Sequence, residues 1–432
     1  MAMKRILLLL SLTVLALSVN SCDLFNLDGP EPPFKSNVTI LYSVGYNDLS
    51  SSLRNDIDDV AEGYLPGVND RNVMLVVAHH SVSNGDFTTP VNPCIIRLYE
   101  SGGAAVRDTV YVMDSSVDTL TTVAGMRKAL TFIKEKYPSK SYGMVFSSHA
   151  TGWMPAGAYD KLKSRDDDIL FAARPYGHGG DAFTPGCSFS TEYYHEPGVK
   201  SIGETAYRTV SGVFTRSLEI YQFAEALPMF FDYIVFDACL AGGIEFAWQL
   251  RGRCGLFCAS QTEILTDGFD YTKLGERLLK GADPDPVGFC ADFYEFYNKR
   301  TGTGKSATVS VIDCRKLQPL AAYSKFLFTK YRYEMEHVDP SSIQAYFRSG
   351  HHWFYDFEDI LIKSGINSQE QGVLSGYLGE CLVYKAATPQ FFGSLEIKHH
   401  SGLSMFLPCD GVSMLHDFYR TLAWNEETGL VK

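Results

Sequence analysis

The chain contains 432 residues, of which 45% are hydrophobic and 13% aromatic, and its formal net charge is −12. This balance supports a large buried core and excludes a disordered or collagen-like chain. A net negative charge gives no general attraction to phosphate backbones, so nucleic acid is not expected as a partner. Generic domain sizes of roughly 100–200 residues allow two or three domains, or one large α/β core with additions.

The N-terminus carries an export pattern. Two basic residues precede an apolar run from Ile6 to Val19, which is too short to cross a bilayer core of about 30 Å comfortably. The segment ending at Cys22 resembles the bacterial lipobox, in which the cysteine becomes the lipidated first residue of the mature protein. We therefore expect residues 1–21 to be a lipoprotein signal peptide and residues 22–36 to be a tether. Ordinary secretion and a buried N-terminal helix are the alternatives.

Hydrophobic strands alternate with amphipathic helices along the rest of the chain. Apolar strands are expected at Val38–Val44, Asn72–Ala78, Tyr142–Ser147, Tyr233–Phe236, Gly255–Ser260 and Ala307–Ile312. A hairpin is expected from Ile95–Tyr99 and Thr109–Met113, and a helix at Thr121–Tyr137. Continuous apolar strands separated by helices are typical of a parallel sheet covered on both faces. The predicted fold is therefore a three-layer α/β/α sandwich with a mainly parallel central sheet.

The later segments indicate two parts. A loop-rich region spans residues 155–202. Helices are expected at Thr215–Ala226, Gly242–Gly252, Tyr271–Lys280, Pro286–Arg300, Leu317–Tyr333 and Glu370–Lys385, with a last strand at Leu403–Leu407. We expect a core over residues 37–312 and a C-terminal helical subdomain over residues 313–432, whose late strand completes the core.

His149 and Cys239 each follow a predicted strand. Sites assemble at the carboxyl ends of strands in doubly wound sheets, so the fold can bring these two residues together. We expect Cys239 to lie just before a helix N-terminus, where the dipole and a nearby imidazole favour the thiolate. His149 would transfer the proton, and the backbone N–H groups of Ala150 and Cys239 would stabilise an oxyanion. The alternative is an inert buried cysteine and an ordinary loop histidine.

Two segments around these residues carry a family pattern. They are Ser148–Trp153 (SHATGW) and Phe236–Glu245 (FDACLAGGIE), and they are accompanied by Thr39–Leu49, Ala259–Tyr271 and Gly402–Pro408. Together these segments resemble the clostripain-like cysteine peptidases, whose relatives are the caspases, gingipains, legumain and separase. The resemblance covers most of the mature chain and implies a caspase-like fold for the core.

The resemblance implies a role for each matching residue. Cys239 would be the nucleophile and His149 the general acid/base. Asp237, two residues before the nucleophile, would line the S1 pocket and select Arg or Lys as the P1 residue of the substrate. The alternative role of Asp237 is to cap the helix that follows.

The chain departs from the family pattern at several positions. Ala150 replaces the usual Gly after the histidine. Phe269 replaces Trp, and Glu263-Ile264 replaces the usual Glu-Pro, which leaves the details of the S1 pocket open.

No cofactor and no metal site are expected for the chemistry, although the resemblance to clostripain leaves calcium binding open. The acidic run 166–168 lacks the spaced ligands of an EF-hand loop and is expected to be a solvated turn. The adjacent pairs His79-His80, His351-His352 and His399-His400 are poorly placed to share a metal. Some family members are activated by cleavage between the two catalytic motifs, where this chain offers Lys161, Lys163, Arg165 and Arg174.

The sequence therefore predicts an exported, lipid-anchored endopeptidase of the bacterial cell envelope. It would cleave proteins or peptides after Arg or Lys through a thioester acyl-enzyme. The alternative is a non-catalytic surface lipoprotein that keeps the peptidase fold for binding, and the Ala150 departure favours it.

Overall fold

The structure is a computed structural model that describes residues 34–82, 91–113, 119–156, 158, 202–209, 212–348 and 352–432. The predicted signal peptide, the lipidation site Cys22 and the tether up to residue 33 lie outside these ranges. The basic residues Lys161, Lys163, Arg165 and Arg174, the acidic run 166–168 and His351 also lie outside them. Among the described helices, none combines the length and the apolar character that a bilayer crossing requires.

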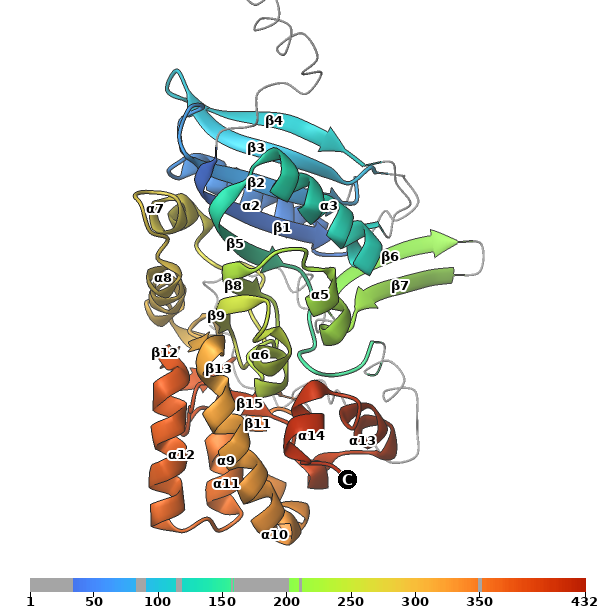
Figure 1. Cartoon of the computed structure of the whole chain (residues 1–432), viewed down its shortest axis with the longest axis vertical. Coiled ribbons are helices and arrows are strands. Elements are labelled where there is room, and N and C mark those ends of the chain that lie inside the picture. Colours follow the sequence, from blue (N-terminus) through green and yellow to red (C-terminus); the bar gives the residue numbers. More distant parts are fainter. Residues whose placement is uncertain are drawn as a thin grey trace, which may run out of the picture.

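A nine-stranded sheet forms the centre of the molecule, in the order β12-β10-β9-β8-β5-β1-β2-β3-β4 (Figure 1). The inner strands are parallel, and they are β9 (Cys254–Ala259), β8 (Phe231–Asp237), β5 (Ser139–Ser147), β1 (Lys35–Gly45) and β2 (Asn72–His80). The edge strands pair antiparallel, and they are β3 (Cys94–Ser101), β4 (Ala104–Val112), β10 (Thr308–Asp313) and β12 (Leu382–Ala387). The predicted mainly parallel sheet and the predicted hairpin are confirmed.

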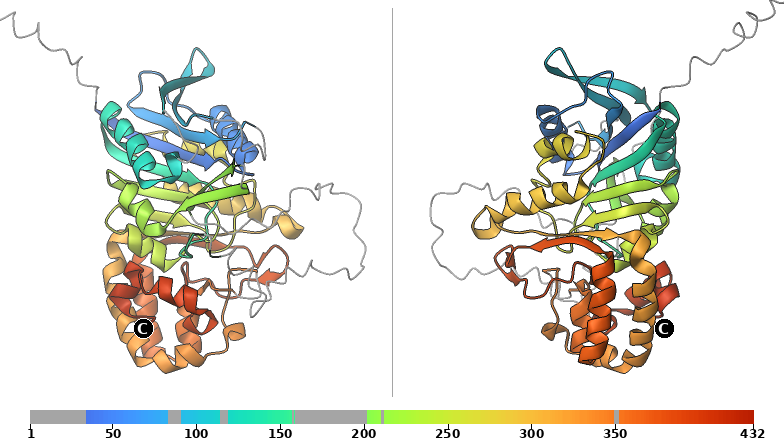
Figure 2. Two further views of the ribbon diagram at one scale, coloured as in Figure 1. Left: turned by 90° about the vertical axis from the view of Figure 1, so that its right-hand side faces the viewer. Right: turned by 60° about the vertical axis from the view of Figure 1, so that its left-hand side comes forward.

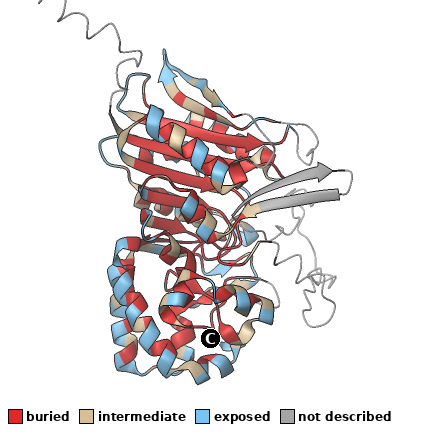
Figure 3. Ribbon diagram, turned by 45° about the vertical axis from the view of Figure 1, so that its right-hand side comes forward, coloured by how far each residue is buried: buried red, intermediate tan, exposed pale blue. Residues whose placement is uncertain are grey.

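Helices cover both faces of this sheet (Figure 2). One face is covered by α3 (Val123–Lys136), α5 (Ile220–Ala226) and α6 (Ile244–Leu250), and the other by α2 (Ser50–Glu62), α7 (Leu274–Leu278) and α8 (Pro286–Asn298). Successive side chains of a strand point to opposite faces, so Ile40 packs into the first helix layer and Leu41 into the second. Because both faces are covered, the inner strands are buried along their length, as Figure 3 shows.

The C-terminal helices gather at the β10–β12 end of the sheet (Figure 1). They are α9 (Leu317–Lys330), α10 (Arg332–His337), α11 (Phe357–Lys363), α12 (Ser368–Cys381), α13 (Ser413–Tyr419) and α14 (Ala423–Thr428). Short two-stranded sheets lie among them, formed by β11 (Tyr355–Asp356) with β15 (Ser404–Met405) and by β13 (Gln390–Phe391) with β14 (Leu395–Glu396).

Two expectations for this C-terminal part are wrong. The late strand predicted at Leu403–Leu407 pairs with Tyr355–Asp356 outside the main sheet. The strand that does join the main sheet is β12, which begins within the last residues of the helix predicted at Glu370–Lys385. The first residues of β12 alternate between half-buried and exposed side chains, which is the period of a strand rather than of a helix.

Two further elements differ from the prediction nearer the centre of the chain. The segment predicted as a helix at Thr215–Ala226 is helical only from Ile220, because β6 (Ile202–Thr209) and β7 (Gly212–Leu218) form an antiparallel hairpin. Helix α2 was not predicted. Its buried apolar side chains are few and are spread through a mostly polar sequence, so the helical period is weak there.

Candidate active site

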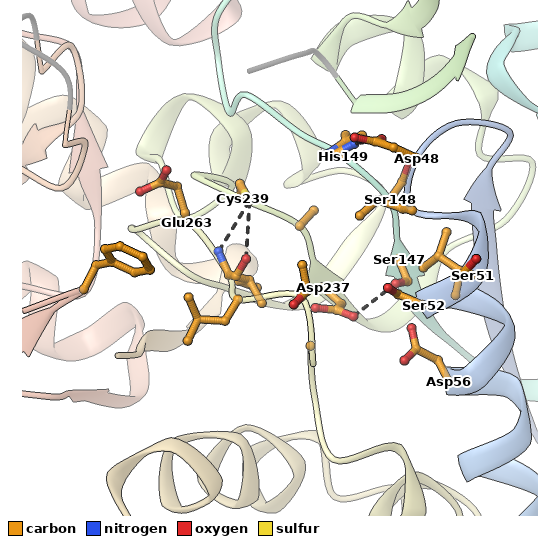
Figure 4. A pocket seen from close by; sticks show the side chains of 18 of the residues that line it. Asp48, Ser51, Ser52, Asp56, Ser147, Ser148, His149, Asp237, Cys239 and Glu263 are labelled. Carbon is orange, nitrogen blue, oxygen red and sulfur yellow. Dashed lines mark hydrogen bonds and ion pairs between the residues drawn. The ribbon is translucent and has the colours of Figure 1, made fainter. Parts of the chain in front are cut away.

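A pocket of about 420 Å³ opens beside the carboxyl ends of β5 and β8 (Figure 4). His149, Asp237 and Cys239 all line it, although His149 lies 90 residues before Cys239 in the chain. They meet because β5 and β8 are neighbouring parallel strands, in which Ser147 lies beside Asp237. The predicted convergence of His149 and Cys239 at one sheet edge agrees with the structure, which also places Asp237 there.

His149 is buried and bonds to Asp48 from the loop after β1. The distance from His149 Nε2 to Asp48 Oδ1 is 2.9 Å. A carboxylate can only accept in this bond, so Nε2 carries the proton. The neutral ring then keeps Nδ1 as a proton acceptor, and Asp48 thereby fixes the tautomer that a general base needs.

The surroundings of Cys239 differ from the prediction. Helix α6 begins at Ile244 with Gly243 as its N-cap, so Cys239 does not lie directly before a helix N-terminus. The thiol instead accepts from the backbone N–H of Ile264 at 3.4 Å and lies 3.8 Å from the carbonyl oxygen of Ile264. Among the described residues, no hydrogen bond joins Cys239 to His149.

This environment keeps the thiol protonated. Burial, together with the nearby negative charge of Glu263, raises the pKa of Cys239 to about 12. The N–H of Ile264 and the more distant Arg348 oppose this rise. The predicted activation of the thiol by the α6 dipole is therefore wrong, because the turn 240–243 separates Cys239 from the helix N-terminus.

The two loops that carry His149 and Cys239 contact each other closely. Gly152 has φ +54°, and a Cβ atom there would lie 2.4 Å from the carbonyl oxygen of Leu240. Leu240, directly after the cysteine, also has a positive φ of 56°, which a bulky residue rarely adopts. Its N–H donates to the carbonyl oxygen of Thr262 at 2.9 Å, which holds the loop in this shape.

The proposed oxyanion donors are present in these loops. Within the described part of the chain, neither the backbone N–H of Ala150 nor that of Cys239 donates a hydrogen bond. An unpaired N–H beside a pocket is suited to receive a developing negative charge. The departure from Gly to Ala150 therefore removes no donor, since both residues carry an N–H.

Asp237 does not cap α6, so its alternative role is wrong. Its Oδ2 accepts from the Tyr271 hydroxyl at 2.6 Å and from Ser147 Oγ at 3.0 Å. Burial raises the pKa of Asp237 to about 6, while these two hydrogen bonds act against the rise. Gly268 covers the carboxylate with φ +58°, and a Cβ atom there would lie 2.6 Å from Oδ2. A side chain at that position would thus clash with this carboxylate.

Sequence reasoning gave no role to three charged residues of the pocket. Asp56 projects from α2 toward Asp237 (Figure 4). Glu263 pairs with Arg348 through two hydrogen bonds of 2.8 Å. Asp56 and Arg348 come from segments distant in sequence from both catalytic motifs, so only the fold places them here.

Of the three histidine pairs, His79-His80 and His399-His400 lie wholly within the described residues. Within the described residues, no three His, Cys, Asp or Glu side chains gather as metal ligands. His80 bonds to Ser43 and His400 to Tyr346, and burial lowers the pKa of both histidines. The segment 353–357 is buried in the core.

Three solved structures share this architecture over almost their whole length. An inactive zymogen of a C11 protease from Parabacteroides distasonis has a TM-score of 0.71 and 22% identity, over 92% of this chain and 99% of that one. A secreted C11 cysteine protease from Bacteroides thetaiotaomicron has a TM-score of 0.70 and 20% identity, over 92% and 100%. A complex of a secreted C11 cysteine protease from the same organism with an irreversible peptide inhibitor has a TM-score of 0.68 and 22% identity, over 91% and 99%. At these identities the likeness shows the fold.

Sequence comparison identifies the family independently. Among curated proteins, no significant relative of the chain is found. The sequence profile of the clostripain family, peptidase group C11, matches residues 41–165 and 203–368, which include both catalytic motifs and most of the sheet. The resemblance seen in the sequence is thereby confirmed, and the chain belongs to the clostripain family of cysteine peptidases.

Proposed function

We propose that the chain is an endopeptidase that cleaves peptide bonds after Arg or Lys, with Cys239 as the nucleophile and His149 as the general acid/base. The observation that carries this proposal is that His149, Cys239 and the buried carboxylate of Asp237 line one pocket. The backbone N–H of Cys239, and that of Ala150 directly after His149, donate no hydrogen bond within the described residues. These are the parts that acyl transfer after a cationic side chain requires.

In the proposed first step, the Cys239 thiol turns from Ile264 toward His149 when a peptide enters. Nδ1 of His149 accepts the thiol proton while sulfur attacks the carbonyl carbon of the substrate. The N–H groups of Ala150 and Cys239 stabilise the oxyanion of the tetrahedral intermediate. The imidazolium then protonates the leaving amine, the C–N bond breaks, and a thioester remains.

The second half of the reaction returns the enzyme to its starting state. His149 takes a proton from a water molecule, whose oxygen attacks the thioester carbon. The C–S bond breaks, the carboxylic acid product leaves, and the proton on His149 returns to the thiolate of Cys239. Asp48 holds the ring in the tautomer that each transfer needs.

A fluorogenic peptide assay tests this proposal, with Arg or Lys at P1 and the Cys239→Ala variant as its partner. We expect turnover by the wild type and a loss of at least about 10³-fold in the variant, since the nucleophile is removed. Turnover that survives Cys239→Ala contradicts the mechanism. No turnover by the wild type, even after limited proteolysis and with calcium, favours the alternative of a binding protein that keeps the peptidase fold.

We also propose that the protein is exported and anchored to the bacterial cell envelope through lipidated Cys22. The N-terminal sequence pattern supports this, as does the description of a relative as secreted. Under the proposed organisation, residues 1–21 are removed, and residues from 22 onward tether a core that extends to residue 312. The predicted tether ends too late, at residue 36, because β1 already begins at Lys35. Residues 313–432 pack against the core. Labelling cells with a fatty acid tests the anchor, because Cys22→Ala should lose both the label and the membrane association.

A further inference from the structure

The pocket contains one acidic side chain that the mechanism above does not use. Asp56 is 7% exposed and lines the pocket from α2, and within the described residues it takes part in no hydrogen bond or ion pair. Figure 4 shows its carboxyl group pointing from the helix toward Asp237. A buried carboxyl group without a partner costs stability, so the fold alone gives no reason to keep it.

The charges of the pocket lining are otherwise paired. Asp48 accepts from His149, and Glu263 forms a two-bond ion pair with Arg348. Asp56 and Asp237 have no cationic partner among the described residues. These two carboxyl groups are therefore the acidic groups of the described pocket lining that lack a cationic partner.

The space around these groups suits a cationic side chain. Asp237 uses Oδ2 for Tyr271 and Ser147, and its Oδ1 has no hydrogen bond within the described residues. Gly268 packs against this carboxylate, and a side chain at that position would clash with it, since a Cβ atom would lie 2.6 Å from Oδ2. A guanidinium or ammonium group between Asp56 and Asp237 could donate to both carboxylates.

We propose that Asp56 is a second specificity-determining carboxylate of the S1 pocket and that an Arg or Lys P1 side chain binds between Asp56 and Asp237. This inference rests on the proposed function, because it concerns the substrate of that same site. Asp237 precedes the nucleophile in sequence, whereas Asp56 reaches the pocket from the first helix after β1.

The protonation of the two groups supports this arrangement. Burial and the neighbouring Asp237 charge raise the pKa of Asp56 to about 9, whereas hydrogen bonds from Tyr271 and Ser147 help hold the pKa of Asp237 to about 6. With these pKa values, Asp237 is mostly ionised at neutral pH and Asp56 is protonated. A cationic P1 side chain would take the place of the Asp56 proton and ionise both groups.

The experiment compares two fluorogenic peptides that differ only at P1, one with Arg and one with its neutral isostere citrulline. The proteins compared are the wild type, Asp56→Asn, Asp237→Asn and the control Asp58→Asn. Asp58 lies on the same helix, but its side chain is 56% exposed and pairs with Arg107 on the surface. The control therefore makes the same chemical change outside the pocket.

We expect Asp56→Asn to lower kcat/KM for the Arg peptide about 30-fold, as for one charge removed from a buried ionic contact, and to leave the citrulline peptide unchanged. Asp58→Asn should change neither value. An equal loss on both peptides, or an unchanged Arg-to-citrulline ratio in Asp56→Asn, overturns the inference. Thermal unfolding of each variant shows whether a loss on both peptides reflects misfolding, and Asp56→Glu should then restore part of the Arg preference.

The pH dependence of the Arg-to-citrulline ratio gives a second test, because ionisation of the thiol and imidazole affects both peptides alike. The wild-type ratio should rise with pH until about 9, whereas in Asp56→Asn it should level off above about 6, where only Asp237 titrates. The other groups whose charges act on Asp56 or Asp237 are Asp59 of α2, Asp267 and Tyr271 after β9, and Tyr297 of α8. All of these groups, and Cys239, whose charge also acts on Asp237, are present in both proteins, so only the Asp56 carboxyl group distinguishes the two profiles. A profile that Asp56→Asn does not change contradicts the inference.

The outcomes separate this inference from the proposed function. If the wild type cleaves neither peptide, or if Cys239→Ala cleaves both, the proposed function fails and the role of Asp56 fails with it. If the wild type prefers Arg and only Asp237→Asn removes that preference, the proposed function stands and the role of Asp56 is refuted.

Discussion

The hydrogen bond to Asp48 determines which ring nitrogen of His149 carries the proton. Its side chain is 60% exposed, whereas that of His149 is 7% exposed, so the acid holds a buried ring from the mouth of the pocket. The bond from Nε2 leaves Nδ1 as the acceptor, which is the state the proposed proton transfer requires. Asp48 is thus a positioning residue that acts through the histidine.

Asp48→Asn is expected to lower kcat roughly tenfold and to leave KM nearly unchanged, since a reoriented ring slows proton transfer without removing substrate contacts. Steady-state kinetics on the Arg peptide measures both values. The melting temperature should not move, because an exposed acid contributes little to stability. Loss of kcat in Asp58→Asn as well would show a general charge effect and contradict the positioning role.

The loops after β5 and β8 form one unit at the scale of elements. Gly152 in the first loop lies against the backbone of Leu240 in the second, and both have positive φ. Strained backbone of this kind persists only where the surrounding structure holds it, and here it lies directly beside the proposed nucleophile. The contact sets how the histidine loop and the cysteine loop lie relative to each other.

Gly152→Ala should therefore reduce both stability and turnover. The new Cβ atom would lie 2.4 Å from the Leu240 oxygen at a φ that alanine disfavours, and the expected loss is about 1–3 kcal/mol in the free energy of unfolding. Gly102→Ala is the matched control, because Gly102 also has a positive φ but nothing lies within 4 Å of its Cβ position. Denaturant unfolding and kcat/KM measure the two effects. If Gly152→Ala and Gly102→Ala lose equal free energy of unfolding, the loss comes from the positive φ alone and not from the contact with Leu240.

At the scale of the whole molecule, the C-terminal part is built into the core. Strand β12 covers the edge of β10 in the main sheet. Glu245 of α6 accepts from the N–H of Phe406 and from the Tyr419 hydroxyl, and the ring of Trp248 lies 5.6 Å from that of Trp424. The two proposed parts of the chain therefore share one hydrophobic core.

Removal of residues 313–432 should leave a chain that does not fold. The truncation uncovers the β10 edge and the buried faces of α6, and exposed strand edges and apolar surface favour aggregation. Size-exclusion chromatography and far-UV circular dichroism of the truncated chain test this. The control lacks only residues 1–33 and should stay monodisperse and folded. A soluble, cooperatively unfolding fragment 34–312 would show that the core is independent.

The residues that lie within one short motif could be found from the sequence. Asp237 ends β8, Cys239 follows it and His149 follows the neighbouring β5, so the apolar pattern and two motifs suffice to place them at one sheet edge. The predicted activation of the thiol by a helix is wrong, because the turn 240–243 separates Cys239 from α6 and the thiol bonds to Ile264 instead. Local spacing does not reveal which backbone a side chain will contact.

Sequence by itself determined the family, the alternation of strands and helices and the three motif residues, because these depend on short segments whose pattern is local. Only the tertiary structure shows that Asp48 bonds to His149, that Asp56 lies near Asp237 and that Arg348 pairs with Glu263. Each of these pairs joins segments far apart in the chain. Their interaction energy depends on distance and burial, and both quantities exist only once the strands have paired and the helices have packed.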